Sequence, residues 1–174
     1  MSQHKNLPLK KGLVYGSLLG TIVIGIGIVR YKTGMILRDD QTLSYVFWCI
    51  FTMTLFYAVF QFKKQDPLSF SYQRTMQIGL FAGLITGVMY TIYIVLLNNY
   101  LDTELTSKII QFKEQAAILN NSAISAKEIK DSTKIMEMNP ALRGLVYTLV
   151  CMTFGIIHSL IGTFAAKKLG TSSQ

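Results

Sequence analysis

The sequence predicts an all-α fold, a polytopic four-transmembrane-helix bundle with a two-helix amphipathic extracytoplasmic insert between helices three and four. Composition is one basis for this prediction, because 51% of the 174 residues are hydrophobic and only 15% are charged, against about 25% charged in an average soluble protein. The other basis is that the apolar residues form long runs without charge. A bilayer requires such runs, since about 20 residues at roughly 1.5 Å each cross its hydrocarbon core.

The spans are expected at about residues 12–29, 43–62, 76–97 and 141–166, within a single membrane domain of residues 1–174. Lysines before the first span resemble a secretion signal, but Arg30 follows it without a small-residue cleavage pattern, so we interpret this span as an uncleaved anchor. The many aromatic residues of the second span are interpreted as lipid-facing and interfacial. Asn139-Pro140 has the pattern of an N-cap and first-turn proline that begin the fourth span.

The polar stretch at about residues 101–139 is expected to be helical. Its apolar residues recur at steps of three and four, the pattern of an amphipathic helix. Ser125 and Glu128 form a capping box, which predicts a second, shorter helix after the first. The insert either lies on the membrane and caps the bundle or forms a docking surface for an envelope protein. The candidate partner surface consists of Leu105, Ile109, Phe112 and Leu119.

The charges predict that both termini are cytoplasmic. The segments on the side of the termini carry 8 basic residues and one acid, Asp66, while the other side carries 9 basic residues with 8 acids in a longer stretch. The two sides are equal by simple count, but positive density in short loops near helix ends favours the first side as cytoplasmic. Arg143, at the opposite edge of the fourth span, is interpreted as reaching the lipid head groups or pairing with an acid of the insert such as Glu137. The net charge of +8 is thus explained without nucleic acid.

Two glycine series have four-residue spacing, the pattern that lets membrane helices approach closely. Both begin at the predicted cytoplasmic edge, so we interpret them as helix-packing faces and consider an internal duplication of two hairpins as a further hypothesis. The two series are Gly12, Gly16 and Gly20 in the first span, and Gly79, Gly83 and Gly87 in the third.

The order of these parts resembles a bacterial integral membrane family, domain of unknown function 4199. The resemblance covers nearly the whole chain and includes Leu68-Ser69-Phe70-Ser71-Tyr72 before the third span and Ala165-Ala166-Lys167-Lys168 at the end of the last. It implies four helices in the cytoplasmic (inner) membrane, mainly of Bacteroidota, and brings no activity and no functional residues. The family's glycine before the third span is absent, and Asp66-Pro67 stands in its place.

His158 lies well inside the fourth span, where an ionisable side chain is a functional candidate. At the same depth the other spans carry Thr21, Thr54 and Thr86, so a polar layer around His158 is one interpretation. The other is a neutral histidine bonded to a hydroxyl or a backbone carbonyl, favoured because no carboxylate lies in any span. No catalytic residues, no cofactor and no metal ligands are expected. Cys49 and Cys151 are interpreted as buried thiols.

These observations favour a non-enzymatic scaffold or accessory subunit that binds another membrane or envelope protein. The expected surroundings are the lipid bilayer and a membrane-protein partner or a second copy of the chain. The alternative is a small transporter or channel with its polar layer around His158.

Overall fold

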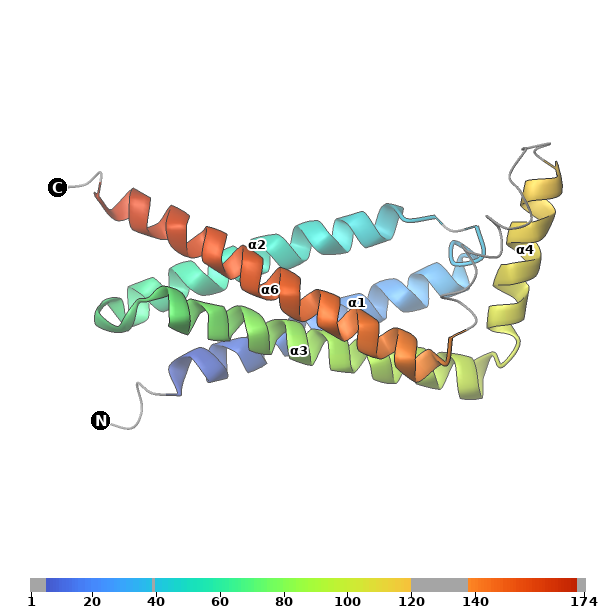
Figure 1. Ribbon diagram of the computed structural model, residues 1–174, viewed down its shortest axis with the longest axis horizontal. Helices are drawn as coiled ribbons and strands as arrows, with labels where there is room; N and C mark the ends of the chain where they lie inside the picture. The colour runs from blue at the N-terminus through green and yellow to red at the C-terminus, as the bar shows by residue number, and fades with distance from the viewer. Residues whose placement is uncertain (1–5, 39, 120–137, 172–174) are drawn as a thin grey trace.

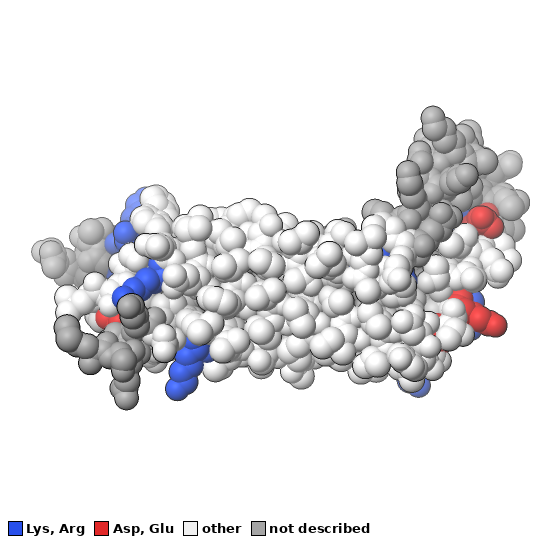
Figure 2. All heavy atoms as spheres, turned by 60° about the horizontal axis from the view of Figure 1, so that its bottom comes forward, with Lys and Arg blue, Asp and Glu red and all other residues white. Residues whose placement is uncertain are grey.

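The computed structural model describes residues 6–38, 40–119 and 138–171, and four long helices in it lie side by side (Figure 1). These helices are α1 (Leu7–Lys32), α2 (Thr42–Gln65), α3 (Tyr72–Leu96) and α6 (Pro140–Thr171). All four are long and apolar enough to cross a membrane. On the face seen in Figure 2, lysine, arginine and acidic residues gather at the two ends and leave an uncharged middle. The chain is a multi-pass membrane protein.

Three shorter elements complete the described fold. The 3-10 turn η1 (Pro67–Ser69) joins α2 to α3, and the π-helical turn η2 (Leu97–Leu101) continues α3. The amphipathic helix α4 (Leu105–Leu119) stands across one end of the bundle (Figure 1). We name this end the α4 end, and the opposite end, where α1 begins and α6 finishes, the terminal end. The second helix predicted for the insert, from Ser125, lies outside the described residues.

Side-chain caps begin three of these elements. The Asn139 Oδ1 atom accepts a 2.9 Å hydrogen bond from the Ala141 amide, which confirms the predicted cap of α6. Asp66 accepts from the Ser69 amide at 3.2 Å, and Ser71 accepts from the Arg74 amide at 3.4 Å. The helices extend beyond the predicted spans because those were bounded by charge, and backbone hydrogen bonding continues into the polar turns.

Helix α3 lies between α1 and α6 and contacts each through a glycine face. A Cβ atom built on Gly16 would lie 2.8 Å from the Ala82 carbonyl oxygen, and one on Gly12 would lie 2.6 Å from Phe81 Cβ. On the other side of α3, a Cβ atom on Gly79 would lie 2.0 Å from the Gly155 carbonyl oxygen. Both series therefore face neighbouring helices of this chain. The α1 series faces α3, within the first three helices, whereas the α3 series faces α6. The two glycine series therefore do not have equivalent packing roles in the two hairpins α1–α2 and α3–α6.

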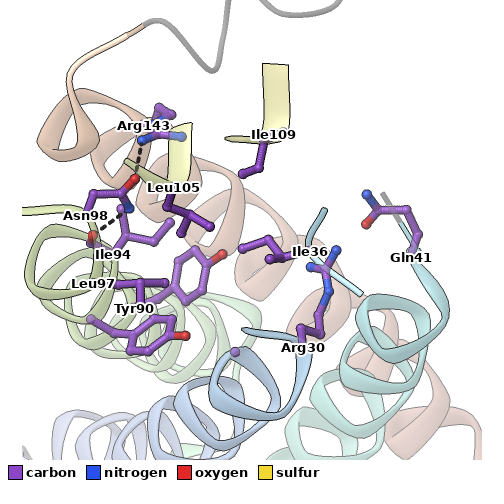
Figure 3. Close-up of a pocket in the computed structure, with 12 residues that line it drawn as sticks. Arg30, Ile36, Gln41, Tyr90, Ile94, Leu97, Asn98, Leu105, Ile109 and Arg143 are labelled. Atoms are coloured by element: carbon purple, nitrogen blue, oxygen red, sulfur yellow. Dashed lines mark hydrogen bonds between the residues drawn. The ribbon is translucent and has the colours of Figure 1, made fainter. Parts of the chain in front are cut away.

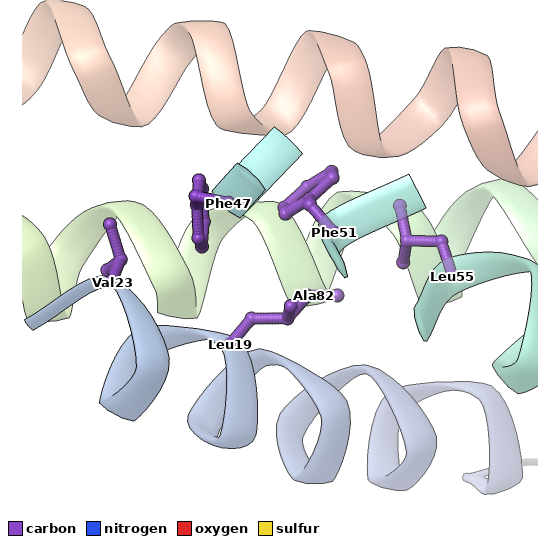
Figure 4. Packing of buried hydrophobic residues seen from close by; sticks show 6 residues of the cluster. All are labelled: Leu19, Val23, Phe47, Phe51, Leu55 and Ala82. Atoms are coloured by element: carbon purple, nitrogen blue, oxygen red, sulfur yellow. The ribbon is translucent and has the colours of Figure 1, made fainter. Parts of the chain in front are cut away.

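Helix α2 fills the remaining space with large side chains. Phe47, Phe51 and Leu55 are buried against Leu19 of α1 and Ala82 of α3 (Figure 4). The prediction that the aromatic residues of this span face lipid is therefore wrong for Phe47 and Phe51. The reason is that glycines let α1 and α3 approach closely, whereas among the described glycines Gly162 of α6 is the one whose nearest neighbours belong to α2. Large side chains of α2 fill the space that remains. Cys151 is buried as predicted, but Cys49 is exposed.

Candidate functional site

The structure does not join the predicted polar layer by hydrogen bonds. Thr21 is exposed and donates to the Ser17 carbonyl of its own helix. Nδ1 of half-buried His158 lies 2.8 Å from the Phe154 carbonyl oxygen, so a protonated Nδ1 donates there. Thr54 is half-buried. Of these four residues, Thr86 is the one with a described hydrogen bond to another helix. No hydrogen bond among the described residues connects two of the four predicted residues of the layer.

Threonine hydroxyl groups, that of Thr86 among them, form polar contacts between α3 and its neighbours. Oγ1 of Thr86 donates to the Gly16 carbonyl oxygen at 3.2 Å and to that of Ala82 at 2.8 Å. Thr163 and Thr75 are bonded at 2.7 Å, and Thr91 and Thr148 at 3.1 Å. These pairs satisfy buried hydroxyl groups within the chain. They tie α3 to α1 and to α6, and they give no continuous polar path.

A cavity of about 180 Å³ lies at the α4 end, between α1, α3, α6 and α4 (Figure 3). Its apolar wall includes Ile36, Ile94 and Leu97, together with Leu105 and Ile109, which enter it from α4. Its polar lining consists of Arg30, Gln41, Tyr90, Tyr93, Asn98 and Arg143. This mixture of a hydrocarbon wall with convergent donors is typical of a small-molecule site.

Arg30 occupies the α1–α2 side of the cavity, in the last turn of α1. Its guanidinium donates to Ser44 Oγ at 3.1 Å and to the Asp40 carbonyl oxygen at 2.9 Å. Both acceptors are neutral, and they hold the planar group in one orientation. Its Nε atom is buried and has no hydrogen-bond partner among the described residues, and neither does the buried Tyr93 hydroxyl.

Arg143 occupies the opposite side of the cavity, near the start of α6 (Figure 3). One of its terminal nitrogens, Nη2, donates to Asn98 Oδ1 at 3.1 Å and to Thr106 Oγ1 at 3.3 Å. Thr106 also donates to Asn98 Oδ1 at 3.1 Å. This network joins α6, η2 and α4. It holds the guanidinium against neutral groups of η2 and α4. The alternative partner named from the sequence, Glu137, lies outside the described residues, and contact with the head groups stays a prediction.

Helix α4 is held on the bundle by buried apolar residues and by polar contacts, which include the ion pair of Lys108 with Asp102. Leu105 and Ile109 are 2% and 3% exposed and pack with Leu97 and, less deeply buried, Tyr31. Asp102 accepts from Lys108 Nζ at 3.0 Å and from the Tyr31 hydroxyl at 3.3 Å. The Lys108 bond lowers the pKa of the Asp102 carboxyl, and the same bond raises the pKa of Lys108. Ion pairing thus links α4 to the end of η2, and the Tyr31 bond extends the link to α1.

The predicted partner surface is divided by this arrangement. Leu105 and Ile109 face the cavity and the bundle, whereas Phe112 is 40% exposed. Nothing is described of the Leu119 side chain. The periodicity identified an apolar face correctly, but two of its residues dock α4 on its own chain.

The cavity is not among the features predicted from the sequence, although some signals for it are present. Arg30 and Arg143 each stand at a span boundary, and alternation of the spans places both at the same end. Tyr90 and Tyr93 lie one turn apart in the third span, which directs them to the same side. The small residues Gly144, Thr148, Cys151 and Gly155 are likewise spaced along one face of the last span, opposite the α3 glycines.

The described residues offer no metal centre, since they contain no group of three or more histidine, cysteine or acidic side chains placed to hold an ion. The cavity has cationic and neutral donors, an arrangement that suits an anion. No curated protein and no solved structure matches the chain. Residues 14–168 match the family described as "Protein of unknown function (DUF4199)", and the chain, as its sequence pattern predicted, belongs to this family.

Proposed function

We propose that the protein is a non-enzymatic accessory subunit of the bacterial cytoplasmic membrane, whose bundle holds α4 in place for another envelope protein. The observation that carries the proposal is the docking of α4. Leu105 and Ile109 are buried in the bundle, and Asp102 and Thr106 bond it to other elements. A helix that only rested on the lipid surface would need no such attachment.

The charges support the orientation that this role requires. The described residues of the terminal end include Lys10, Lys11, Lys63, Lys64, Arg74, Lys167 and Lys168, with Asp66 as the one described acid. Basic residues in short segments mark the cytoplasmic side. Both termini are then cytoplasmic and α4 is extracytoplasmic. The α4 end, with basic and acidic residues mixed, fits the outer side.

The surface left for a partner is the outward side of α4, around Phe112. The glycine faces do not serve this purpose, because α1, α3 and α6 use them for their own contacts. An exposed aromatic residue on a fixed helix is a suitable anchor, since aromatic residues contribute strongly to binding at interfaces.

The alternative, a small transporter around His158, has less support. It requires a polar path, whereas the described hydroxyl groups bond locally between neighbouring helices. An enzymatic role would need a nucleophile and a base, or a metal. We therefore propose neither the transporter nor an enzyme.

Photocrosslinking in living cells tests the accessory role. A photoreactive amino acid at Phe112 is expected to trap one defined protein, and the same residue at fully exposed Leu68, in η1 at the terminal end, is expected not to trap it. The Ile109→Asp substitution should undock α4 and weaken the adduct at Phe112. Absence of any protein adduct at Phe112, or identical adducts at both positions, would contradict the proposal.

A further inference from the structure

We infer that the cavity beneath α4 binds a phosphate-type oxyanion between Arg30 and Arg143, carried by a lipid head group or free in solution. The inference does not depend on the partner role of α4. The bundle can fold without this ligand, so the ligand would be a functional one.

The donors of the cavity indicate the chemistry. Arginine presents planar N–H groups that match phosphate oxygens, and charge-assisted bonds are stronger than neutral ones. Arg30 forms no ion pair with a described carboxylate, and its described partners are a hydroxyl and a carbonyl oxygen. Within the described part of the chain, no carboxylate therefore neutralises the guanidinium directly, although its charge also lowers the pKa of the nearby Asp40 carboxyl.

Unpartnered donors supply an independent observation. Buried polar groups nearly always have hydrogen-bond partners, so each exception needs an explanation. Nε of Arg30 and the hydroxyl of Tyr93 are such exceptions among the described residues, and both residues line this cavity. Gln41 and Asn98 line it as well. A ligand with several acceptor oxygens would satisfy the Tyr93 hydroxyl and the arginine together.

The volume and the apolar wall of the cavity suit a ligand larger than a bare ion. At roughly 30 Å³ for each water molecule, 180 Å³ is the room of about six waters. Leu97, Leu105 and Ile109 give the cavity an apolar wall, which suits the carbon atoms that follow a phosphate in a lipid.

The depth of the site also fits a head group. With 26 residues at roughly 1.5 Å each, α1 is about 39 Å long. The hydrocarbon core measures about 30 Å, and about 40–45 Å with the polar regions. Arg30, two residues before the end of α1, and Arg143, three residues after the start of α6, therefore lie at the level of lipid phosphates.

Binding to the purified full-length protein in a maltoside detergent tests the site. The probes are phosphatidylglycerol, diacylglycerol with the same acyl chains, and inorganic phosphate, and the readouts are native mass spectrometry and the shift of Tm. Phosphatidylglycerol, but not diacylglycerol, is expected to bind and raise Tm. Tm shifts from inorganic phosphate alone would support the free anion as the source, and shifts from the phospholipid alone would support the lipid.

Variants locate the binding. Arg30→Gln should weaken it about tenfold, the equivalent of one charge-assisted hydrogen bond. Arg38→Gln, which removes the same charge from an exposed position outside the cavity lining, should leave it unchanged within about twofold. Tyr93→Phe removes one hydroxyl with little change of shape, so it tests the site even if Arg30→Gln fails to fold. Equal binding of both lipids without a response to phosphate, or wild-type affinity in both Arg30→Gln and Tyr93→Phe, would overturn the inference.

Discussion

The hydroxyl group of Thr163 on α6 donates a 2.7 Å hydrogen bond to the hydroxyl of Thr75 on α3, and both side chains are fully buried. Each hydroxyl also bonds a carbonyl oxygen of its own helix, Thr75 that of Tyr72 and Thr163 that of Ser159. The pair therefore connects two helices at the terminal end without leaving a polar group unsatisfied.

Replacing Thr163 with valine is expected to destabilise the bundle by about 0.6 kcal/mol and by no more than about 1.7, the range measured for hydrogen bonds between membrane helices. Unfolding in mixed micelles measures the change. Thr153→Val is the matched control, because Thr153 is exposed and bonds only the Leu149 carbonyl of its own helix. Equal losses in the two variants would show that the bond between helices adds nothing.

Glycine at position 79 is expected to be essential for the contact of α3 with α6. A Cβ atom there would lie 2.0 Å from a backbone oxygen of Gly155, and backbone cannot move aside as a flexible side chain can. Gly79→Ala should therefore cost at least about 1–3 kcal/mol, as overpacking does. Gly25→Ala, where a Cβ atom meets nothing within 4 Å, should be tolerated. The free energy of unfolding checks both, and comparable stability of the two variants would refute this packing.

Shortening Ile109 to alanine is expected to loosen α4. Truncation of a buried isoleucine costs about 2–5 kcal/mol, and here the loss falls on the attachment of one helix. Hydrogen exchange of the α4 amides should speed up while exchange in α3 and α6 stays slow. Phe112→Ala, at a 40% exposed position of the same helix, should change the exchange rate of the α4 amides little. Faster exchange throughout the protein would instead mean that α4 and the bundle unfold together.

The Asp102–Lys108 pair should make the stability depend on pH on the acid side. The hydrogen bond from Lys108 holds the folded-state pKa of Asp102 below the ordinary value of an aspartate, so its contribution is present above that ordinary pKa and is lost as the pH falls through the folded one. Lys108 has a raised pKa, so its share is present below its ordinary pKa and is lost as the pH rises through the folded one. The Tm difference between wild type and Asp102→Asn should be constant near neutral pH and should shrink below about pH 4. A difference that does not shrink at all as the pH falls from 4 to about 2 would indicate that the substitution acts through packing.

The four helices could be predicted because the bilayer requires a long apolar run for each, and the cap at Asn139 because its pattern is local. The polar layer failed for a geometrical reason. Counting residues gives depth along a helix but not the direction of a side chain. Gly20 faces Met89 of α3, so Thr21, about 100° further around the helix, points away and is exposed. His158 stands in the same relation to fully buried Ser159.

The cavity could not be predicted from local pattern, because it needs four elements at once. Arg30 and Arg143 are more than a hundred residues apart, and part of the apolar wall between them, Leu105 and Ile109, comes from α4. Their meeting depends on how α4 docks. The periodicity of Leu105 and Ile109 shows that α4 has an apolar face, but it does not show what that face contacts.

The central position of α3 has a consequence for how the protein is made. Synthesis proceeds from the N-terminus, so α1 enters the bilayer before its partner α3 exists, and α3 enters before α6. Gly12, Gly16 and Gly20 are therefore bare to lipid until α3 arrives, and Gly79 and Gly83 until α6 does. A nascent chain that stalls before Pro140 presents an uncovered glycine face. Covering of this face by α6 therefore distinguishes the finished bundle from an unfinished chain.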